Sequence, residues 1–474
     1  MGDLRCDAAI IGGGPGGYVC ALRCAQLGKK TVLVENRELG GTCLNRGCIP
    51  TKTLLHTAEL YDEIKNHGRE LGLLFKGAEN LDGLGVDYDA LAARKDRITE
   101  KLRRGIEGLI RGRQITLVRE TAVFLGPQTI GAGGDRITAR NIVIAAGSEP
   151  ASIPVPGADL PVVFNSDGVL SLKSLPESAV IIGGGVIGVE FAALFSSFGK
   201  KVTIIEMLPN ILNGMDNSVC ETMTGILKKR GVEIHRGAKL LEIGDLSGKG
   251  LCVYEEGGGR KEASGEIVIM AVGRRPSTKS LGLQASGAVL ERGYITVDEG
   301  LRTTVPGIYA IGDITGKVQL AHGASAQGLV AAANIAGEGG AGRGGAAKIR
   351  YGVIPACVYT NPEIACVGLT ETQVKESGIP YKTGNFPAAA NGRSLIMNAS
   401  EGFVKIITHG ETGEILGAHI VAPRATDMIG EIAAAMRAEA TIEELADTVH
   451  PHPTVSEMIM EAAHDVEGLC CHKL

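Results

Sequence analysis

The sequence predicts an α/β protein that has two doubly wound parallel-sheet domains and a third, α+β domain at the C-terminus. Three observations support this fold class. The chain has 474 residues, enough for about three domains of roughly 150 residues each. Glycine supplies 68 of these residues, about twice its usual share of roughly 7%. A pattern of strand, glycine loop, helix and strand also occurs twice.

The repeated pattern occupies residues 7–35 and 178–206. The first copy reads DAAIIGGGPGGYVCALRCAQLGKKTVLVE and the second reads SAVIIGGGVIGVEFAALFSSFGKKVTIIE. In each copy an apolar strand leads into a G-x-G-x-x-G loop, then an amphipathic helix, then a second strand that ends in an acid. The residues concerned are Gly12, Gly14, Gly17 and Glu35 in the first copy, and Gly183, Gly185, Gly188 and Glu206 in the second.

This unit is typical of Rossmann-like dinucleotide sites. The glycines let backbone N–H groups approach a pyrophosphate at a helix N-terminus, and the acid accepts hydrogen bonds from ribose hydroxyls. Glycines that serve only close packing of helix on strand are the less favoured alternative. A lone glycine loop is weak support, whereas the complete unit found twice is specific. Two dinucleotide sites in one chain indicate two redox cofactors and an electron relay between them.

Further strands and linkers divide the chain into domains. Apolar runs at 142–148, 267–274 and 307–313 are predicted to complete the two sheets. A linker with three prolines at 148–156 and the low-complexity stretch 337–345 are predicted boundaries. The first nucleotide domain is expected at 1–150 and 276–347, the second at 151–275, and the C-terminal domain at 348–474.

The C-terminal domain lacks a nucleotide fingerprint. Its predicted strands lie at 403–408 and 415–421, and its alanine-rich helix at 427–439. This alternation of strands with a helix predicts an α+β layer.

Charge and apolar patterning exclude several classes of protein. The 48 basic and 53 acidic residues give a net charge of −5 without long runs of one sign, which disfavours nucleic acid and anionic membranes as partners. No apolar run approaches the ~18 residues of a membrane span. Asp3 and Asp7 stand where a signal peptide would be basic. We therefore expect a soluble cytoplasmic protein.

Two of the eleven cysteines stand out. Cys43 and Cys48 lie in GGTCLNRGCIPTK, residues 40–52, and a bend at Gly47 can bring their sulfurs within bonding distance. Amides at a helix start, together with Lys52, would favour a thiolate there. Two unrelated packing cysteines are the alternative. Zinc is disfavoured because the cysteines lack the usual paired spacing.

The segment GGTCLNRGCIPTK resembles the redox-active disulfide segment of the flavin-dependent pyridine nucleotide–disulfide oxidoreductases, most closely that of the dihydrolipoamide dehydrogenases. The resemblance covers essentially the whole chain through GGGVIGVE, GIYAIGDI, VIPACVYTNPEIACVGLTE and HPHPTVSEM. It implies that the first nucleotide domain binds FAD, the second binds NAD, and the C-terminal domain forms the interface of a homodimer.

The resemblance also implies roles for individual residues. Cys48 would be the thiol next to the flavin, and Cys43 the thiol that exchanges with substrate. Lys52 would pair with Glu190 near the flavin edge. The implied FAD-binding residues are Gly12, Gly14, Gly17, Glu35, Lys52, Ser148, Asp313, Gln319, Leu320, Ala321 and His322. The implied NAD-binding residues are Gly183, Gly185, Gly188, Glu206 and Gly273.

A base that accepts the proton of the substrate thiol is expected in the segment HPHPTVSE, residues 450–457. Thiol–disulfide exchange needs a proton acceptor, and imidazole titrates in the right range. The family's His-Pro-Thr pattern implies that His452 is this base and that Glu457 orients it, with His450 as the structural alternative. Because the family's C-terminal domain docks on the partner's flavin domain, the active site would be shared between two chains.

The implied activity is that of a dihydrolipoamide dehydrogenase, which oxidises protein-bound dihydrolipoyl groups and reduces NAD. The partner would be a lipoyl-carrying protein of a 2-oxo acid dehydrogenase, an acetoin dehydrogenase or the glycine cleavage system. One alternative is another disulfide or metal reductase of the family. Cys470-Cys471 would suit a thioredoxin reductase, whereas mercuric reductases carry Tyr at the position of His452. A flavin-binding subunit without disulfide chemistry is a further alternative.

Two narrower expectations concern specificity and the tail. NAD should be preferred to NADP, because a 2′-phosphate would meet Glu206 and residues 207–210 offer no Arg or Lys. A helix over 456–468 should carry the Cys470-Cys471 pair away from His452, with too little chain beyond it to fold back. The pair is therefore expected to be dispensable.

Overall fold

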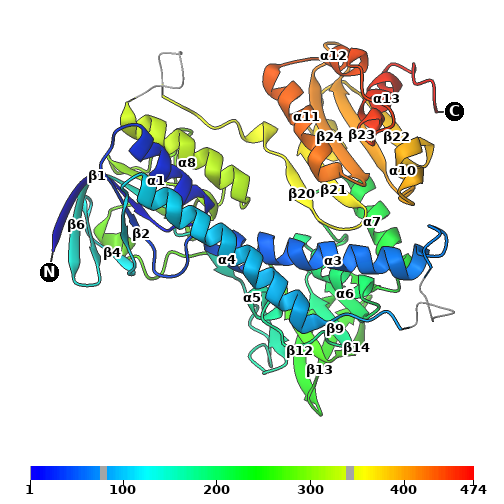
Figure 1. Cartoon of the computed structure of the whole chain (residues 1–474), viewed down its shortest axis with the longest axis horizontal. Coiled ribbons are helices and arrows are strands. Elements are labelled where there is room, and N and C mark those ends of the chain that lie inside the picture. The colour runs from blue at the N-terminus through cyan, green and yellow to red at the C-terminus, as the bar shows by residue number, and fades with distance from the viewer. Residues whose placement is uncertain (1, 75–82, 338–345, 474) are drawn as a thin grey trace. The chain divides into compact units, whose positions relative to one another are not determined.

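The computed structural model describes residues 2–74, 83–337 and 346–473 (Figure 1). The chain forms two compact units, each assembled from three stretches. The first unit comprises Met1–Thr53, Asp87–Ala151 and Arg274–Ile349, and the second comprises Leu54–Val86, Ser152–Gly273 and Arg350–Leu474. The low-complexity stretch predicted at 337–345 lies, apart from Gly337, outside the described residues.

A mixed sheet, mostly parallel with an antiparallel edge, forms the centre of the first unit. Its order is β3 (Thr116–Val118), β2 (Thr31–Val34), β1 (Asp3–Ile11), β6 (Asp135–Ile144), β5 (Thr129–Ala132) and β4 (Ala122–Gly126), and β19 (Ile308–Ala310) also pairs with β6. The first four strands and β19 run parallel. The last four residues of β1 and all four residues of β2 are buried. Such burial is expected when helices cover both faces of a parallel sheet.

Helices of the first unit pack closely through glycine. α1 (Pro15–Gln26) contacts both α8 (Ala321–Ala336) and α4 (Tyr88–Gly112), and Figure 1 shows α1 and α8 side by side. A Cβ on Gly328 would lie 2.5 Å from the Gly16 carbonyl oxygen. Any other residue at Gly328 would therefore push the two helices apart.

The second unit contains a second parallel sheet, a meander and the C-terminal layer. The parallel sheet has the order β11 (Glu233–Arg236), β10 (Lys201–Glu206), β9 (Ser178–Ile182), β15 (Ile267–Met270) and β8 (Val163–Phe164). Its helices are α6 (Val186–Ser197) and α7 (Asn217–Lys229). The antiparallel meander is formed by β12 (Lys239–Leu246), β13 (Lys249–Glu256) and β14 (Gly259–Gly265).

The C-terminal layer is an antiparallel sheet covered by helices. Its order is β20 (Ala356–Val358), β21 (Glu363–Gly368), β24 (Ile415–Ala422), β23 (Phe403–His409) and β22 (Tyr381–Pro387). α11 (Ala425–Ala438) packs on β21 and β24, as Figure 1 shows, and α13 (Glu457–Val466) packs on β22 and β23. The predicted fold class is confirmed.

The remaining α-helices and strands are short apart from α3. They are α2 (Gly41–Arg46), α3 (Cys48–His67), β7 (Ser148–Pro150), α5 (Ser166–Val169), β16 (Arg274–Pro276), β17 (Leu290–Glu291), β18 (Tyr294–Ile295), α9 (Glu371–Glu376), α10 (Gly392–Ile396) and α12 (Ile442–Asp447). The start of the predicted linker at 148–156 is thus the strand β7, which pairs with β16. Across the described residues, no helix is long and apolar enough to cross a membrane.

Candidate active site

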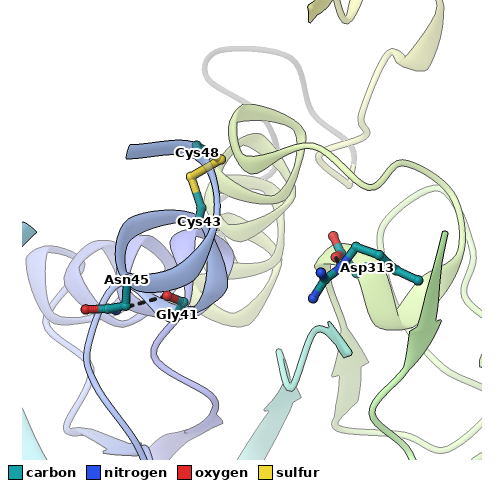
Figure 2. Close-up of a disulfide and its surroundings, with 6 residues drawn as sticks. Gly41, Cys43, Asn45, Cys48 and Asp313 are labelled. Atoms are coloured by element: carbon teal, nitrogen blue, oxygen red, sulfur yellow. Dashed lines mark hydrogen bonds and ion pairs between the residues drawn. A yellow bond between two sulfur atoms is a disulfide. The ribbon is translucent and has the colours of Figure 1, made fainter. Parts of the chain in front are cut away.

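A disulfide joins Cys43 in α2 to Cys48 at the start of α3 (Figure 2). Their Cα atoms are 4.7 Å apart, because the chain turns between the two helices at Gly47. A Cβ on Gly47 would lie 3.0 Å from the Thr42 carbonyl oxygen, so the turn favours glycine. The bend predicted at Gly47 therefore joins the two cysteines that the sequence singled out.

Polar contacts hold the turn that carries Cys43. The Asn45 side-chain amide donates to the Gly41 and Leu39 carbonyl oxygens at 2.9 and 3.0 Å, and Figure 2 shows the first of these bonds. The Arg46 guanidinium lies 2.6 Å from the Glu38 carboxylate. Burial raises the pKa of Glu38, but Arg46 outweighs it and the net pKa is lowered. These contacts tie α2 to the segment that precedes it, residues 38–41.

The first glycine loop, in the same unit, has the shape of a dinucleotide cradle. Gly12 has φ +104°, and a Cβ there would lie 2.3 Å from the Ala145 carbonyl oxygen. No side chain caps α1 at Gly14, so its first N–H groups can face a phosphate. The Glu35 carboxylate accepts from the Gly13 and Arg37 N–H groups at 2.6 and 2.7 Å, which fixes it beside the loop. The residues therefore fit a dinucleotide.

The second glycine loop repeats this geometry in the second unit. Gly183 also has φ +104°, and a Cβ there would lie 2.5 Å from the Ala271 carbonyl oxygen. No side chain caps α6 at Gly185. The buried Glu206 carboxylate accepts from the Gly184 and Leu208 N–H groups at 2.5 and 2.6 Å. Both acids therefore make the same two backbone bonds, and both loops fit the same kind of ligand.

Asp313, which is labelled in Figure 2, lies in a polar cluster of the first unit. Its carboxylate accepts from the Ser148 hydroxyl. The Arg274 guanidinium donates to the Ser148 hydroxyl and carbonyl oxygens, both at 2.7 Å. Sequence reasoning selected Ser148 and Asp313 but missed Arg274, which is 126 positions from Ser148. The pairing of β7 with β16 brings Arg274 and Ser148 together.

The predicted base and its partner meet in the second unit. His452 Nδ1 lies 2.9 Å from Glu457 Oε1, and Glu457 Oε2 accepts from the Thr454 N–H at 2.8 Å. Burial raises the pKa of Glu457, but the Thr454 N–H and His452 lower it overall. With Nδ1–H donating to the carboxylate, Nε2 can accept a proton, and the His452 side chain is 79% exposed. This pair can therefore act as an oriented base.

His450, two residues earlier, has a different environment. Its side chain is buried, with Nδ1 2.9 Å from the Thr448 carbonyl oxygen and Nε2 2.8 Å from Glu431 Oε1. Both ring nitrogens therefore face acceptors within the fold. The His450 side chain is therefore held inside the fold, whereas that of His452 is exposed.

Glu190 and Lys52 belong to different units. Glu190 is buried in α6, where its Oε1 accepts from the Tyr359 N–H at 3.1 Å. Lys52 lies in α3, one turn after Cys48. Their pairing stays a prediction.

The C-terminal tail corrects one expectation. The chain reverses at Gly468, which has φ +70°, and the Leu469 N–H donates to the His464 carbonyl oxygen at 2.9 Å. Cys470 Sγ then lies 3.1 Å from Glu461 Oε2, and His472 Nδ1 lies 2.6 Å from Glu461 Oε1. The expectation that the tail is too short to fold back was wrong, because Gly468 adopts the left-handed conformation and reverses the chain within two residues.

The tail thiol nearest α13 is held in its neutral form. Burial, and then the hydrogen bond to Glu461, raise the pKa of the Cys470 thiol to about 11. A thiol is nucleophilic only as the thiolate. Cys470 is therefore a poor relay for electrons in this conformation.

Comparison with known proteins identifies the family of this chain and agrees with its fold. The family described as pyridine nucleotide-disulphide oxidoreductase matches residues 6–328, and its dimerisation domain matches residues 354–463. The chain belongs to this family. It is an oxidoreductase, and its family uses FAD and NAD(H), so the predicted family and cofactors are confirmed.

The relatives found cover nearly the whole chain. The dihydrolipoyl dehydrogenase of Chlamydia muridarum is 41% identical over 463 residues, covering 96% of both proteins. That of Geobacillus stearothermophilus is 40% identical, covering 100% of this chain and 99% of the relative. Among solved structures, LpdA from Mycobacterium tuberculosis has a TM-score of 0.87 at 28% identity, covering 97% of this chain and 99% of its own. The copper(II) complex of the HOCl-induced flavoprotein disulfide reductase RclA from Escherichia coli has a TM-score of 0.85 at 29% identity, covering 98% and 99%.

Proposed function

We propose that this enzyme oxidises dihydrolipoyl groups through the Cys43–Cys48 disulfide and FAD, and reduces NAD. The observation that carries the proposal is the disulfide between α2 and α3, in the same unit as a complete dinucleotide loop. The identity of about 40% to dihydrolipoyl dehydrogenases over their full length supports the choice of substrate.

The exchange steps follow from the residues of this chain. His452 Nε2 takes the proton of one substrate thiol, and Glu457 stabilises the resulting imidazolium. The substrate thiolate attacks Cys43 Sγ, the Cys43–Cys48 bond breaks, and Cys48 leaves as a thiolate. The second substrate thiol then attacks the mixed disulfide, closing the substrate disulfide, and its proton passes to Cys43. FAD and NAD, when bound, supply the route by which the electron pair leaves as hydride.

The assignment of binding residues is part of the proposal. Gly12, Gly14 and Gly17 would hold the FAD pyrophosphate, and Glu35 its adenosine ribose. Ser148, Asp313, Lys52 and residues 319–322 would hold the rest of FAD, and Arg274 would position Ser148 through its two hydrogen bonds. Gly183, Gly185, Gly188, Glu206 and Gly273 would hold NAD. Domain boundaries near residues 150, 275 and 347 accompany this assignment.

The assembly is proposed on the same grounds. The match to the family's dimerisation domain supports a homodimer, in which His452 of one chain would serve the disulfide of the other. The lipoyl partner would belong to a 2-oxo acid dehydrogenase, an acetoin dehydrogenase or the glycine cleavage system. We also place the enzyme in the cytoplasm, a choice that its full-length identity to bacterial dihydrolipoyl dehydrogenases supports.

Steady-state assays test the choice of substrate. Dihydrolipoamide with NAD should give the highest kcat/KM, compared with glutathione disulfide, thioredoxin and Hg(II), each assayed with NADH and with NADPH. Cys43→Ser should abolish turnover of dihydrolipoamide while the protein retains FAD. Cys6→Ser, which changes a cysteine of the same unit that is not part of a disulfide, should have no effect. A higher kcat/KM for thioredoxin or Hg(II) would contradict the proposal.

A further inference from the structure

A cation lies beside the acid of the second glycine unit, although it is distant in the sequence. Arg236, the last residue of β11, pairs in register with Glu206, the last residue of β10. Neighbouring parallel strands are about 4.8 Å apart, and residues in register point to the same face. Residues 207–210 contain no Arg or Lys, so the sequence of the turn after Glu206 gives no sign of this cation.

The two chain segments stay together beyond the strand ends. The Ala238 N–H donates to the Glu206 carbonyl oxygen at 2.9 Å, and the Gly237 N–H to that of Leu208 at 3.0 Å. Arg236 Nη1 donates to Asn210 Oδ1 at 2.9 Å and to Glu221 Oε1, on α7, at 2.8 Å. The guanidinium is therefore bonded to the turn that follows Glu206, where a ribose 2′-substituent would lie.

Glu206 is held more firmly by its backbone hydrogen bonds than Arg236 is by its ion pair with Glu221. Glu206 is buried, and both of its oxygens accept backbone N–H groups, so its negative charge is fixed in place. Glu221 is 60% exposed, and exposed ion pairs are weak. A phosphate matches the planar fork of an arginine better than a single carboxylate oxygen does. Arg236 can therefore exchange Glu221 for a phosphate, and the negative charge of Glu206 opposes this exchange without blocking it completely.

We propose that Glu206 and Arg236 together determine the choice between NAD and NADP. Glu206 repels a 2′-phosphate and so keeps it away from Arg236, which would otherwise bind it. Loss of the Glu206 carboxylate alone, without any added Arg, then admits a 2′-phosphate. The inference rests on the proposed assignment of the second glycine loop to NAD.

Binding of adenosine 2′,5′-bisphosphate and of 5′-AMP to the FAD-loaded enzyme, measured by calorimetry, tests the proposal. Glu206→Ala should bind the bisphosphate about tenfold or more tightly than the wild type, as expected for one charge-assisted contact. Arg236→Met added to Glu206→Ala should remove this gain. Arg260→Met is the matched control, because Arg260 forms an exposed pair with Glu242 in the same unit. Added to Glu206→Ala, it should leave the gain intact.

Because Glu206→Ala changes a buried residue, a second variant tests the proposal at an exposed position. Glu221→Gln changes an exposed residue and releases Arg236 from its ion pair, so it should raise bisphosphate affinity severalfold. Arg236→Met should cancel that rise. Gains that persist without Arg236, or the absence of any gain in Glu206→Ala and Glu221→Gln alike, would overturn the proposal. A wild-type enzyme that binds neither 5′-AMP nor NADH would instead refute the NAD assignment itself.

Discussion

Lys405 is a buried cation whose removal should destabilise the second unit. It lies on β23 with 7% of its surface exposed, and its Nζ is 2.9 Å from Asp216 Oδ1 and 2.7 Å from Glu371 Oε2. Lys405→Met keeps most of the apolar stem and removes the charge. Asp216, only 2% exposed, then loses its cation. Breaking a buried ion pair by removing one partner costs about 3–5 kcal/mol.

The matched control is Lys382→Met. Lys382 pairs with Glu467 at 2.9 Å, but both side chains are 45% exposed. An exposed pair contributes about 0–1 kcal/mol. Because the chain contains no tryptophan, far-UV circular dichroism in a urea titration of the FAD-loaded enzyme is the suitable assay. A midpoint for Lys405→Met no lower than that for Lys382→Met would refute this reasoning.

A second substitution should restore part of the loss. Asp216 caps α7 by accepting from the Ser218 N–H, and asparagine caps helices about as well as aspartate. Asp216→Asn in the Lys405→Met background removes the unpaired charge and keeps the cap. The double variant should therefore be more stable than Lys405→Met alone.

Asp216 and Glu371, the two carboxylates that pair with Lys405, make stability depend on pH. Burial raises the pKa of Asp216, but hydrogen bonds from Ser218, Lys405 and the Glu371 N–H hold it well below its usual range. Hydrogen bonds from Lys375 and Lys405 lower the pKa of Glu371 to about 2. Carboxyl groups with lowered pKa values stabilise the fold above their unfolded values of about 4, and this contribution is lost as pH falls through the folded values. The wild type should therefore lose more stability than Lys405→Met between about pH 4 and 2.

Three further predictions concern the active site and the tail. Mixing Cys48→Ser chains with His452→Gln chains should restore activity towards half of wild type per heterodimer, since one site would be intact; heterodimers without activity would place the base within its own chain. Glu457→Gln should lower kcat about 100-fold or more at unchanged FAD content, because the carboxylate both orients His452 and stabilises its imidazolium; unchanged kcat would remove Glu457 from the mechanism. Deleting residues 470–474 should leave dihydrolipoamide oxidation within about twofold, because Cys470 is held as a neutral thiol; loss of activity with FAD still bound would show that the tail takes part.

Features that depend on neighbouring residues could be predicted from the sequence. The two glycine units, the turn at Gly47 and the Cys43–Cys48 bond each arise within about 30 residues, where backbone preferences and spacing decide the outcome. The strands and helix predicted at 403–439 appear as β23, β24 and α11, with ends shifted by one or two residues.

Features that depend on distant strands could not be predicted in this way. Arg274 reaches Ser148 only through the pairing of β7 with β16, and Arg236 meets the turn after Glu206 only because β11 lies beside β10. Lys405 and Asp216 are 189 positions apart. The reversal of the tail did leave a signal, because glycine directly after a helix favours the left-handed conformation that turns the chain.

Thiol trapping tests the central claim, that Cys43 and Cys48 accept the electrons of the substrate. The oxidised chain should expose nine thiols to alkylation after denaturation, since two of its eleven cysteines form the disulfide. One equivalent of dihydrolipoamide, added without oxygen and before alkylation, should raise the count to eleven. Peptide mass spectrometry should place the two new labels on Cys43 and Cys48. A count that stays at nine, or new labels on other cysteines, would contradict the account.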